Sequence, residues 1–360
     1  MAHYLITGHT GFKGAWLTFL LKSQGHEVSG LALDPLPGSI FDRANLTQDL
    51  THDFRIDIRD RDHTVRAVKT AQPDYVIHMA AQALVREGYR NPRYTYETNV
   101  TGTLNVLEAI DKTDSVTAQL IVTTDKVYLD QVLDRPYVET DPLGGKDPYS
   151  ASKAMADILA QEFLARDGAK PGAIARAGNV IGAGDVSHER LIPDVVRAIE
   201  TGKPLVLRYP EAIRPWQHVL DCLNGYLTLL HSADESGFRG AFNFGPHSDA
   251  VSPVRHIVAI VREVLDLPLR TKTENASDLP EDQYLLLDSS LARTRLGWIE
   301  SFNLQQSLQD SVAILGELGS SDYRAHFLQA IHSWGEKVEV ITDLEQSPDT
   351  GLTDVEARRG

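Results

Sequence analysis

The chain of 360 residues has little of several features that mark common classes of protein. Its single cysteine, Cys222, excludes an internal disulfide. The 13 histidines show no metal-ligand spacing, and there is no His-Glu-x-x-His or Cys-x-x-Cys pattern, so we expect no metal ion. No apolar run approaches the roughly 18 residues that a membrane-spanning helix needs. The N-terminus has no basic stretch before its glycines, so we expect no signal peptide.

Positive charge is also scarce, since the formal net charge is −15. Such a balance argues against nonspecific binding to nucleic acid or to an anionic membrane surface. An anionic ligand would therefore need a local basic pocket. The hydrophobic content of 42% is ordinary for a globular protein and can fill a core. These features predict a cytoplasmic protein with neither nucleic-acid nor membrane partners.

The N-terminal segment has the order strand, glycine-rich turn, helix, strand. Residues 4–6 and 28–33 are apolar and predict strands, while residues 15–24 predict the amphipathic helix between them. Three glycines spaced three residues apart fill the turn. They let the backbone approach a pyrophosphate closely, and the N-terminus of the helix then faces its negative charge. The segment therefore predicts a dinucleotide site, the alternative being a glycine-rich turn without a ligand.

The choice between NAD and NADP depends on two charged residues. Asp34 lies 20 residues after Gly14, where a carboxylate bonds the ribose hydroxyls and repels a 2′-phosphate. This favours NAD, although Lys13 in the turn could pair with a phosphate. The residues predicted to bind the cofactor are Gly8, Thr10, Gly11, Phe12, Lys13, Gly14, Asp34, Asp57, Ile58, Ala80, Ala81, Gln82, Asn99, Thr123, Tyr149 and Lys153.

Strands and helices keep alternating up to residue 176. The expected strands are 54–58, 75–78, 119–123 and 173–176, and the expected helices are 61–71, 95–111 and 149–166. Such alternation predicts an α/β fold, a Rossmann-type doubly wound parallel sheet covered by helices on both faces. We expect residues 1–176 to form the NAD-binding domain.

Beyond residue 176 the alternation loosens. One helix is expected within 188–200, and further helices are expected at 219–230, 254–265, 290–295, 303–315 and 322–334. The expected strands lie within 205–218, 241–246 and 285–288. We expect 177–338 to form a smaller C-terminal α/β substrate-binding lobe, interleaved with the sheet. Residues 339–360 are polar, acidic and rich in turn formers, which predicts a mobile tail.

The segment around Tyr149 carries the strongest chemical signal. Tyr149 and Lys153 are spaced i and i+4 behind Asp147, which can cap a helix, and Pro148, which can begin one. On that helix they share one face. A nearby ammonium favours the phenolate, so we expect Lys153 to lower the pKa of Tyr149 and make it a base. The alternative is a surface tyrosine and a solvated lysine.

A second signal lies where the strand 119–123 ends. Its apolar residues give way to the polar residues Thr123, Thr124, Asp125 and Lys126. A buried parallel strand ends in this way when its carboxyl tip carries chemistry. The alternative for Asp125 and Lys126 is a surface ion pair, which needs no function.

Together these segments resemble an extended short-chain dehydrogenase/reductase, and within that family the nucleotide-sugar 4,6-dehydratases, most closely the subgroup acting on CDP-glucose. The matching segments are Thr-Gly-His-Thr-Gly-Phe-Lys-Gly (7–14), Ala-Leu-Asp-Pro (32–35), Asp-Ile-Arg-Asp (57–60), His-Met-Ala-Ala-Gln (78–82), Thr-Asp-Lys (124–126), Asp-Pro-Leu-Gly-Gly (141–145), Asp-Pro-Tyr-Ser-Ala-Ser-Lys (147–153), Arg-Ala-Gly-Asn-Val-Ile-Gly (176–182), Arg-Leu-Ile-Pro (190–193) and Arg-Pro-Trp-Gln-His-Val (214–219). They cover roughly residues 3–300. The chain departs from the subgroup at 129–140, where a Trp-Gly-Tyr-Arg-Glu-Asn core is usual, so the resemblance leaves the hexose and base preference open.

The resemblance implies a catalytic set and a tightly bound, recycled NAD+. Tyr149 takes the proton of the sugar 4-hydroxyl, Lys153 keeps Tyr149 ionised, and Thr124 positions the 4-oxygen. Asp125 protonates the leaving 6-hydroxyl, while Lys126 is either the C5 base or a residue that orients Asp125. Related dehydratases often carry Glu where Lys126 stands. Epimerases and simple reductases usually carry small residues at 125 and 126, so this pair favours a dehydratase.

The resemblance also implies a substrate site and a homodimer. The substrate-binding residues are expected to be Asn179, Arg190, Leu191, Arg214 and His218, with the arginines on the diphosphate. His218 could equally be a packed histidine. The helices 95–111 and 150–165 would pair with their mates in a four-helix bundle. The alternatives are a 4-epimerase or decarboxylase on the same scaffold, a dehydratase for another nucleotide sugar, and an inactive NAD-binding scaffold protein.

Overall fold

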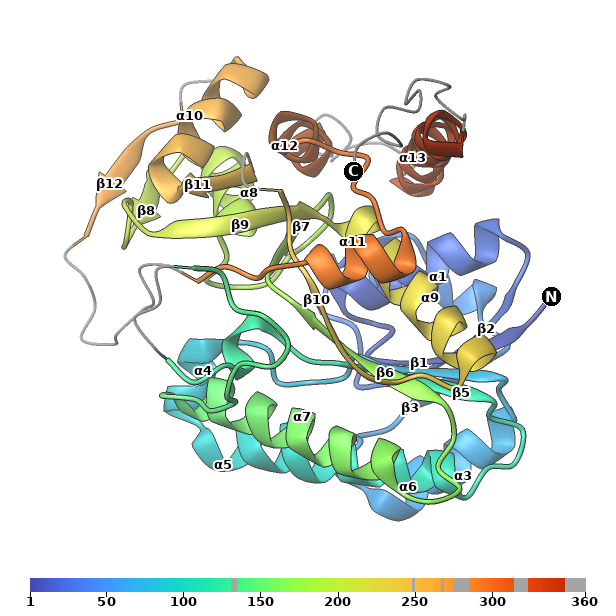
Figure 1. Ribbon diagram of the computed structural model, residues 1–360. Coiled ribbons are helices and arrows are strands. Elements are labelled where there is room, and N and C mark those ends of the chain that lie inside the picture. The colour runs from blue at the N-terminus through green and yellow to red at the C-terminus, as the bar shows by residue number, and fades with distance from the viewer. Residues whose placement is uncertain (131–134, 248–249, 267–268, 275–284, 314–322, 347–360) are drawn as a thin grey trace, which may run out of the picture.

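We describe the protein from a computed structural model (Figure 1). It describes residues 1–130, 135–247, 250–266, 269–274, 285–313 and 323–346. Seven parallel strands form the central sheet in the order β10-β6-β5-β4-β1-β2-β3. They are β1 His3–Thr7, β2 Glu27–Ala32, β3 His52–Arg55, β4 Tyr75–His78, β5 Ala118–Val122, β6 Gly172–Ala177 and β10 Arg239–Phe244. The predicted doubly wound parallel sheet is confirmed.

Helices cover both faces of this sheet (Figure 1). One layer contains α1 Phe12–Ser23, α9 Val219–Ser236 and α11 Ser290–Leu296, and the other contains α3 Arg61–Ala71, α6 Gly102–Asp111 and α7 Pro148–Ala165. The alternation of β1 shows why two layers are needed. Tyr4 and Ile6 are buried in the core on the α1 and α9 side, whereas Leu5 is buried in the core on the α3 and α6 side.

The outer part of the second layer departs from the prediction of one helix at 95–111. The segment consists of α5 Pro92–Tyr96, a π-helical turn at Glu97–Thr101, and α6. The short helix α4 Val85–Arg90 precedes them. The wider π turn inserts an extra residue per turn and lies at Asn99, which it points into the interior.

A smaller lobe lies beyond the carboxyl edge of the sheet (Figure 1). It contains the sheet β11-β9-β7 and the pair β12-β8. Its elements are β7 Asn179–Ile181, α8 Leu191–Thr201, β8 Leu205–Leu207, β9 Ile213–His218, β11 Val251–Pro253, α10 Val254–Leu265, β12 Thr271–Thr273 and α12 Leu304–Ala313. Trp216, Ile257 and Leu308 belong to its separate apolar core. The helix α9 and the strand β10 lie between β9 and β11 in sequence but belong to the large sheet and its layer.

Several element boundaries differ from those expected. The strand expected at 54–58 spans His52–Arg55 instead. The strand expected at 285–288 is a single bridge between Tyr137 and Leu287. Residues 314–315, expected at the end of α12, lie outside the described residues.

The last helix, α13 Tyr323–Gln346, packs on α1, where Phe327 meets Trp16 and Phe19. It thus runs through the first part of the segment 339–360 that we expected to be a mobile tail, and residues 347–360 lie outside the described residues. Two further short helices are α2 Ile40–Arg43 and the 3-10 turn η1 Leu46–Asp49. Of the described helices, none is long and apolar enough to cross a membrane.

Candidate active site

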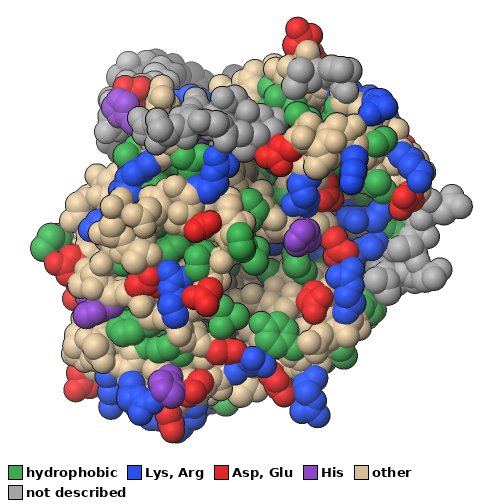
Figure 2. All heavy atoms as spheres, turned by 180° about the vertical axis from the view of Figure 1, so that it is seen from behind, with side chains coloured by type: hydrophobic (Ala, Val, Ile, Leu, Met, Phe, Trp, Pro, Cys, Tyr) green, Lys and Arg blue, Asp and Glu red, His purple; other side chains and the backbone are tan. Residues whose placement is uncertain are grey.

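A cavity of about 590 Å³ lies between the carboxyl ends of the parallel strands and the smaller lobe. The predicted residues that line it are Gly8, Thr10, Gly11, Phe12, Lys13, Gly14, Asp57, Ile58, Ala80, Ala81, Thr123, Thr124, Asp125, Lys126, Tyr149, Lys153, Asn179, Arg190, Leu191 and Arg214. The other predicted residues, Asp34, Gln82, Asn99 and His218, are not part of its wall. On the face seen in Figure 2, acidic and basic side chains are mixed, so no single sign dominates that face.

The glycine-rich turn forms one end of the cavity. A Cβ on Gly14 would lie 2.2 Å from the carbonyl oxygen of Gly8, and Gly8 itself has a φ of +79°. Both positions therefore require glycine. Gly11 caps α1 without a side-chain hydrogen bond, which leaves the first N–H groups of the helix for an anion. A close backbone and free N–H donors fit the pyrophosphate of a dinucleotide.

Of the two charged residues weighed for NAD against NADP, Lys13 lines the cavity and Asp34 does not. Lys13 donates from Nζ to the hydroxyl of Tyr226 on α9 over 3.0 Å, and burial lowers the pKa of Lys13. Asp34 is exposed, because β2 ends at Ala32 and the chain turns outward. Leu33 rather than Asp34 contributes to the cavity wall.

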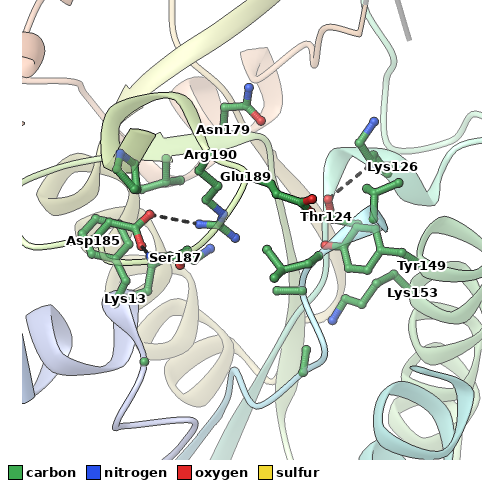
Figure 3. A pocket seen from close by; sticks show the side chains of 18 of the residues that line it. Lys13, Thr124, Lys126, Tyr149, Lys153, Asn179, Asp185, Ser187, Glu189 and Arg190 are labelled. Atoms are coloured by element: carbon green, nitrogen blue, oxygen red, sulfur yellow. Dashed lines mark hydrogen bonds and ion pairs between the residues drawn. The ribbon is translucent and has the colours of Figure 1, made fainter. Parts of the chain in front are cut away.

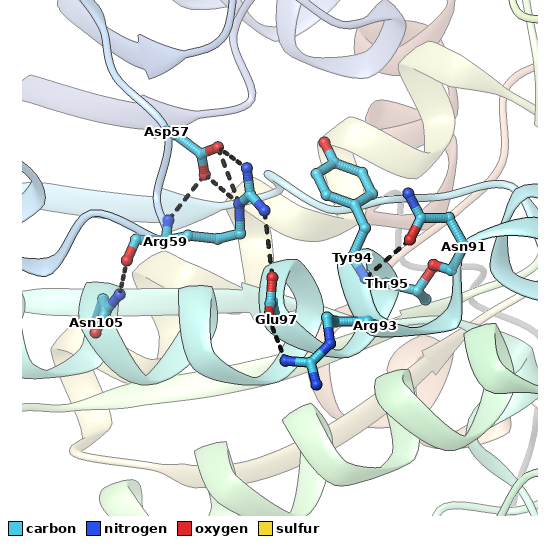
Figure 4. A network of polar contacts seen from close by, with 8 residues as sticks. All are labelled: Asp57, Arg59, Asn91, Arg93, Tyr94, Thr95, Glu97 and Asn105. Atoms are coloured by element: carbon cyan, nitrogen blue, oxygen red, sulfur yellow. Dashed lines mark hydrogen bonds and ion pairs between the residues drawn. The ribbon is translucent and has the colours of Figure 1, made fainter.

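Asp57 and Ile58 form the wall after β3. Figure 4 shows Asp57 accepting hydrogen bonds from Arg59, including one of 2.6 Å from Nη2. Partial burial alone would raise the pKa of Asp57, but the hydrogen bonds from Arg59 lower it. Asn105 on α6 donates to the carbonyl oxygen of Ile58 over 2.9 Å. These contacts fix the backbone that borders the site.

Gln82 and Asn99 do not line the cavity but support its wall through hydrogen bonds. Asn99 accepts from the N–H of Gln82 over 2.8 Å and donates to the hydroxyl of Ser152 on α7 over 2.8 Å. The π turn points Asn99 to this place. The contacts tie the loop after β4 to α7 and so position Ala80 and Ala81, which do line the cavity.

Tyr149 and Lys153 lie on the first turns of α7 and point into the cavity (Figure 3). The helix begins as predicted, since Asp147 accepts from the N–H of Ser150 over 3.0 Å. The Nζ of Lys153 donates to the carbonyl oxygen of Val122 at the end of β5 over 2.8 Å. The pair is therefore brought together with the tip of β5.

Burial dominates the protonation of this pair, which corrects the expectation that Lys153 lowers the pKa of Tyr149. Burial raises the pKa of Tyr149 to about 12, while its hydrogen bond with Thr124 acts in the opposite direction. Burial, together with the charge of Lys13, lowers the pKa of Lys153 to about 8. Removal from water disfavours the charged forms of both groups.

The tip of β5 points successive side chains to opposite sides. Thr123 donates its hydroxyl to Asp157 on α7 over 2.9 Å, away from Tyr149. Thr124 donates to Asp125 over 2.8 Å. Lys126 is half-buried, and its N–H donates to the hydroxyl of Thr124 over 3.4 Å. Figure 3 shows Thr124 beside the ring of Tyr149, with Lys126 on the same side of the cavity.

The smaller lobe contributes the two arginines that were predicted to bind the diphosphate. Arg214 on β9 is buried, and Arg190 precedes the first turn of α8, 3.5 Å from Asp185. Asn179 begins β7 and Leu191 begins α8. His218 ends β9 but lies behind the wall, where it is fully buried, 3.0 Å from Asp310 and packed on Phe302. The structure thus places His218 as a packed histidine.

Several charged residues of the wall were not predicted, and Arg86, Glu189 and Arg208 are among them. Glu189 pairs with Arg90 of α4 over 2.8 Å and has a left-handed φ of +63°, a conformation that often marks functional loops. Backbone conformation and pairing across the cavity leave no mark in the spacing of the sequence, so no pattern identified these residues.

The segment 129–140 is the one in which the sequence departs from the subgroup. None of its described residues lines the cavity. Arg135 forms a bidentate pair with Asp141, and Tyr137 stacks on Tyr128. Residues 131–134 lie outside the described residues. Nor does the described part of the chain contain a group of three or more His, Cys, Asp or Glu side chains that could hold a metal ion.

A doubly wound sheet with a glycine-rich anion site, facing a buried tyrosine and lysine one helical turn apart, defines the extended class of short-chain dehydrogenases/reductases. The model of the NAD dependent epimerase/dehydratase family matches residues 4–245. The chain belongs to this family.

Among its relatives is the CDP-glucose 4,6-dehydratase of Salmonella typhimurium, 38% identical over 84% of this chain and 87% of the relative. A UDP-glucose 4-epimerase from Stenotrophomonas maltophila with bound NAD has a TM-score of 0.79 at 20% identity, over 88% of this chain and 99% of that one. A double mutant of the dTDP-glucose 4,6-dehydratase DesIV from Streptomyces venezuelae, with NAD bound, has a TM-score of 0.75 at 24% identity, over 87% and 97%. These two structures support the fold.

Proposed function

We propose that the protein is an NAD-dependent hydro-lyase that converts a nucleotide diphosphate hexose, CDP-glucose in the first place, into its 4-keto-6-deoxy sugar. The observation that carries this proposal is the juxtaposition of Thr124 and Asp125 with Tyr149 in one cavity. A simple oxidation needs the tyrosine, but loss of water also needs a proton donor at the strand tip. The likeness to the CDP-glucose 4,6-dehydratase supports the same reaction.

NAD, when bound, would accept a hydride from C4 of the sugar and return it to C6, with no net oxidation. Tyr149 would take the proton of the 4-hydroxyl, with Thr124 hydrogen-bonded to the same oxygen. Lys153 would bond the ribose beside the nicotinamide. The glycine-rich turn would hold the pyrophosphate of the cofactor.

The 4-ketone makes the hydrogen on C5 acidic, so elimination needs one base and one acid. Asp125 would protonate the leaving 6-hydroxyl, a role suited to a carboxylic acid. Lys126 lies on the same side of the cavity and would either remove the C5 proton or orient Asp125 and a water (Figure 3). Arg190 and Arg214 would bind the diphosphate, with Asn179 and Leu191 beside it.

Incubation with CDP-, GDP-, UDP- and dTDP-hexoses tests the proposal. We expect a 4-keto-6-deoxy sugar from CDP-glucose, with the C4 hydrogen recovered at C6. A 4-epimer as the product would identify the epimerase alternative, to which the epimerase of similar fold belongs, and loss of CO2 from a nucleotide-hexuronic acid added to the panel would identify the decarboxylase alternative. No conversion of any sugar by NAD-loaded protein would favour a scaffold protein.

We also propose a cytoplasmic homodimer that pairs through the segments 95–111 and 150–165 in a four-helix bundle. Met155 and Ile158 lie three residues apart on α7 and are 49% and 53% exposed, so this face offers an apolar contact to a second copy. Light scattering should give twice the chain mass of 39.8 kDa. Ile158→Lys should yield a monomer, and a monomeric unaltered protein would contradict the proposal.

A further inference from the structure

A buried ion pair lies directly behind the strand tip. Arg176 on β6 and Asp157 on α7 form two hydrogen bonds, 2.9 Å from Nε and 2.7 Å from Nη2. Their side chains are 1% and 0% exposed. A fully desolvated pair is weak evidence for stability alone, because hydrophobic residues of similar volume often stabilise as well. Stability alone therefore does not explain this ion pair, and we looked for a role in the active site.

The first reason is the contact of Asp157 with Thr123, the residue before Thr124. Asp157 accepts the hydroxyl of Thr123 over 2.9 Å on the same oxygen that meets Arg176. It also lies one turn after Lys153 on α7, and its charge acts to raise the pKa of Lys153 against burial. Asp157 thus joins the end of β5 to the helix that carries Tyr149.

The second reason is the contact of the same guanidinium with Tyr128, which follows Val127. Nη1 of Arg176 donates to the hydroxyl of Tyr128 over 3.0 Å and to the carbonyl oxygen of Glu139 over 3.0 Å. The hydroxyl of Tyr128 donates in turn to Asn243 on β10 over 2.6 Å. Arg176 on β6, Asp157 on α7 and Asn243 on β10 thus meet the residues that flank the strand tip.

We propose that Arg176 and Asp157 are positioning residues that clamp both ends of the segment Thr124–Val127. One guanidinium holds Thr123 through Asp157 at one end and Tyr128 directly at the other. Asp125 and Lys126 lie between these two points, whereas Tyr149 lies in the first turn of α7, which Asp147 caps. This inference rests on the proposed function. Because the clamp positions Asp125 and Lys126, we expect it to affect the elimination step more than the oxidation step.

Two variants test the clamp in the full-length, NAD-loaded protein with CDP-glucose. Tyr128→Phe removes one hydroxyl and keeps the stacked ring, and Asp157→Asn keeps the shape of the carboxyl group without its charge. Misplacement of an acid by about 1 Å can cost roughly a hundredfold in rate. We expect elimination to slow about tenfold in Tyr128→Phe and about a hundredfold in Asp157→Asn. Absorbance of bound NADH should persist in Tyr128→Phe, whereas Asp157→Asn also removes a charge that raises the pKa of Lys153, so oxidation should slow in that variant as well. The dissociation constant of CDP-glucose should stay within about twofold in both.

Asp49→Asn is the matched control. It breaks the bidentate pair of Asp49 with Arg324, which lies away from the cavity wall. It should lower the melting temperature but leave the ratio of elimination to oxidation unchanged. An unchanged ratio in both clamp variants, or an equal change in the control, would overturn the proposal.

Amide hydrogen exchange tests the clamp without any turnover. The N–H groups of Asp125, Lys126 and Val127 should exchange faster in Tyr128→Phe than in the unaltered protein, and not in Asp49→Asn. If CDP-glucose is not converted, the proposed function fails, while exchange still decides whether Arg176 holds the tip. Unchanged exchange in Tyr128→Phe would contradict the clamp even in an active dehydratase.

Discussion

At the scale of single residues, the two halves of the proposed reaction depend on different side chains. Tyr149→Phe removes the base for the 4-hydroxyl and should abolish the first hydride transfer. Asp125→Asn keeps size and hydrogen bonding but cannot donate an acidic proton to the 6-hydroxyl. It should form NADH and the 4-keto sugar and then stall, since general acid catalysis is typically worth about 100- to 10,000-fold. Stopped-flow absorbance of NADH distinguishes the two variants.

Normal turnover of Asp125→Asn, without trapped NADH, would remove Asp125 from the elimination step. Lys126 is tested in heavy water. If Lys126→Met exchanges deuterium into C5 at the unaltered rate, Lys126 is not the C5 base and instead orients its neighbour.

Arg214 offers a separate test of the substrate site. Its guanidinium is buried in the wall of the smaller lobe, where a charge-assisted hydrogen bond to a diphosphate is worth roughly 1.5–3 kcal/mol. Arg214→Ala should therefore raise the dissociation constant of the substrate about tenfold to a hundredfold, with unaltered NAD affinity. Calorimetric titration measures both. Arg255→Ala, which removes an exposed arginine of the same lobe, should change neither.

At the scale of elements, the junction of β1, the glycine-rich turn and α1 tolerates no side chain at Gly14. A Cβ there would lie 2.2 Å from the oxygen of Gly8 and 2.6 Å from the Cα of His9, and both are backbone atoms. Gly14→Ala must displace the turn, and overpacking of this kind costs about 1–3 kcal/mol. We expect a lower melting temperature and loss of the NAD that is retained during purification.

Gly335→Ala is the control for this change. Gly335 lies within α13, and a Cβ there meets nothing within 4 Å. Since Ala favours a helix over Gly by about 1 kcal/mol, this variant should be as stable as the unaltered protein or more so. A Gly14→Ala protein that retains NAD equally well would contradict the proposed cofactor site.

At the scale of the whole molecule, buried histidines connect folding to pH. His78 is buried between Thr7 and Thr103, with ring nitrogens 2.7 and 2.9 Å from their hydroxyls, and burial lowers its pKa to about 3. The unfolded chain protonates this group near its ordinary pKa of about 6.5. Its contribution to stability is therefore complete above about pH 6.5 and is lost as the pH falls toward 3.

The predicted slope is up to about 1.4 kcal/mol of unfolding free energy per pH unit from this one group. Urea unfolding of the unaltered protein and of His78→Gln at a series of pH values measures it. The variant should be less stable at neutral pH but should lose stability less steeply on acidification. Equal slopes would show that His78 is not the group that titrates. The carboxyl of Glu300, whose pKa burial raises to about 7, contributes equally to both proteins and cancels.

The sequence alone determined the parallel sheet, the glycine-rich turn and the pairing of Tyr149 with Lys153. Each depends on interactions between residues close in the chain: alternation of apolar residues, glycine spacing, and the i, i+4 geometry of a helix capped by Asp147. Asp125 and Lys126 could also be identified from the sequence alone, because they directly follow an apolar strand.

Only the tertiary structure decided the electrostatics and the supports of the site. Burial, which depends on the whole fold, raised the pKa of Tyr149 where adjacency to Lys153 predicted the reverse. Folding brings Arg176 to Asp157 and Tyr128, and packs His218 behind the wall. The sequence carries no local trace of such contacts, since they join elements far apart in the chain, and desolvation is a property of position in the fold rather than of residue type.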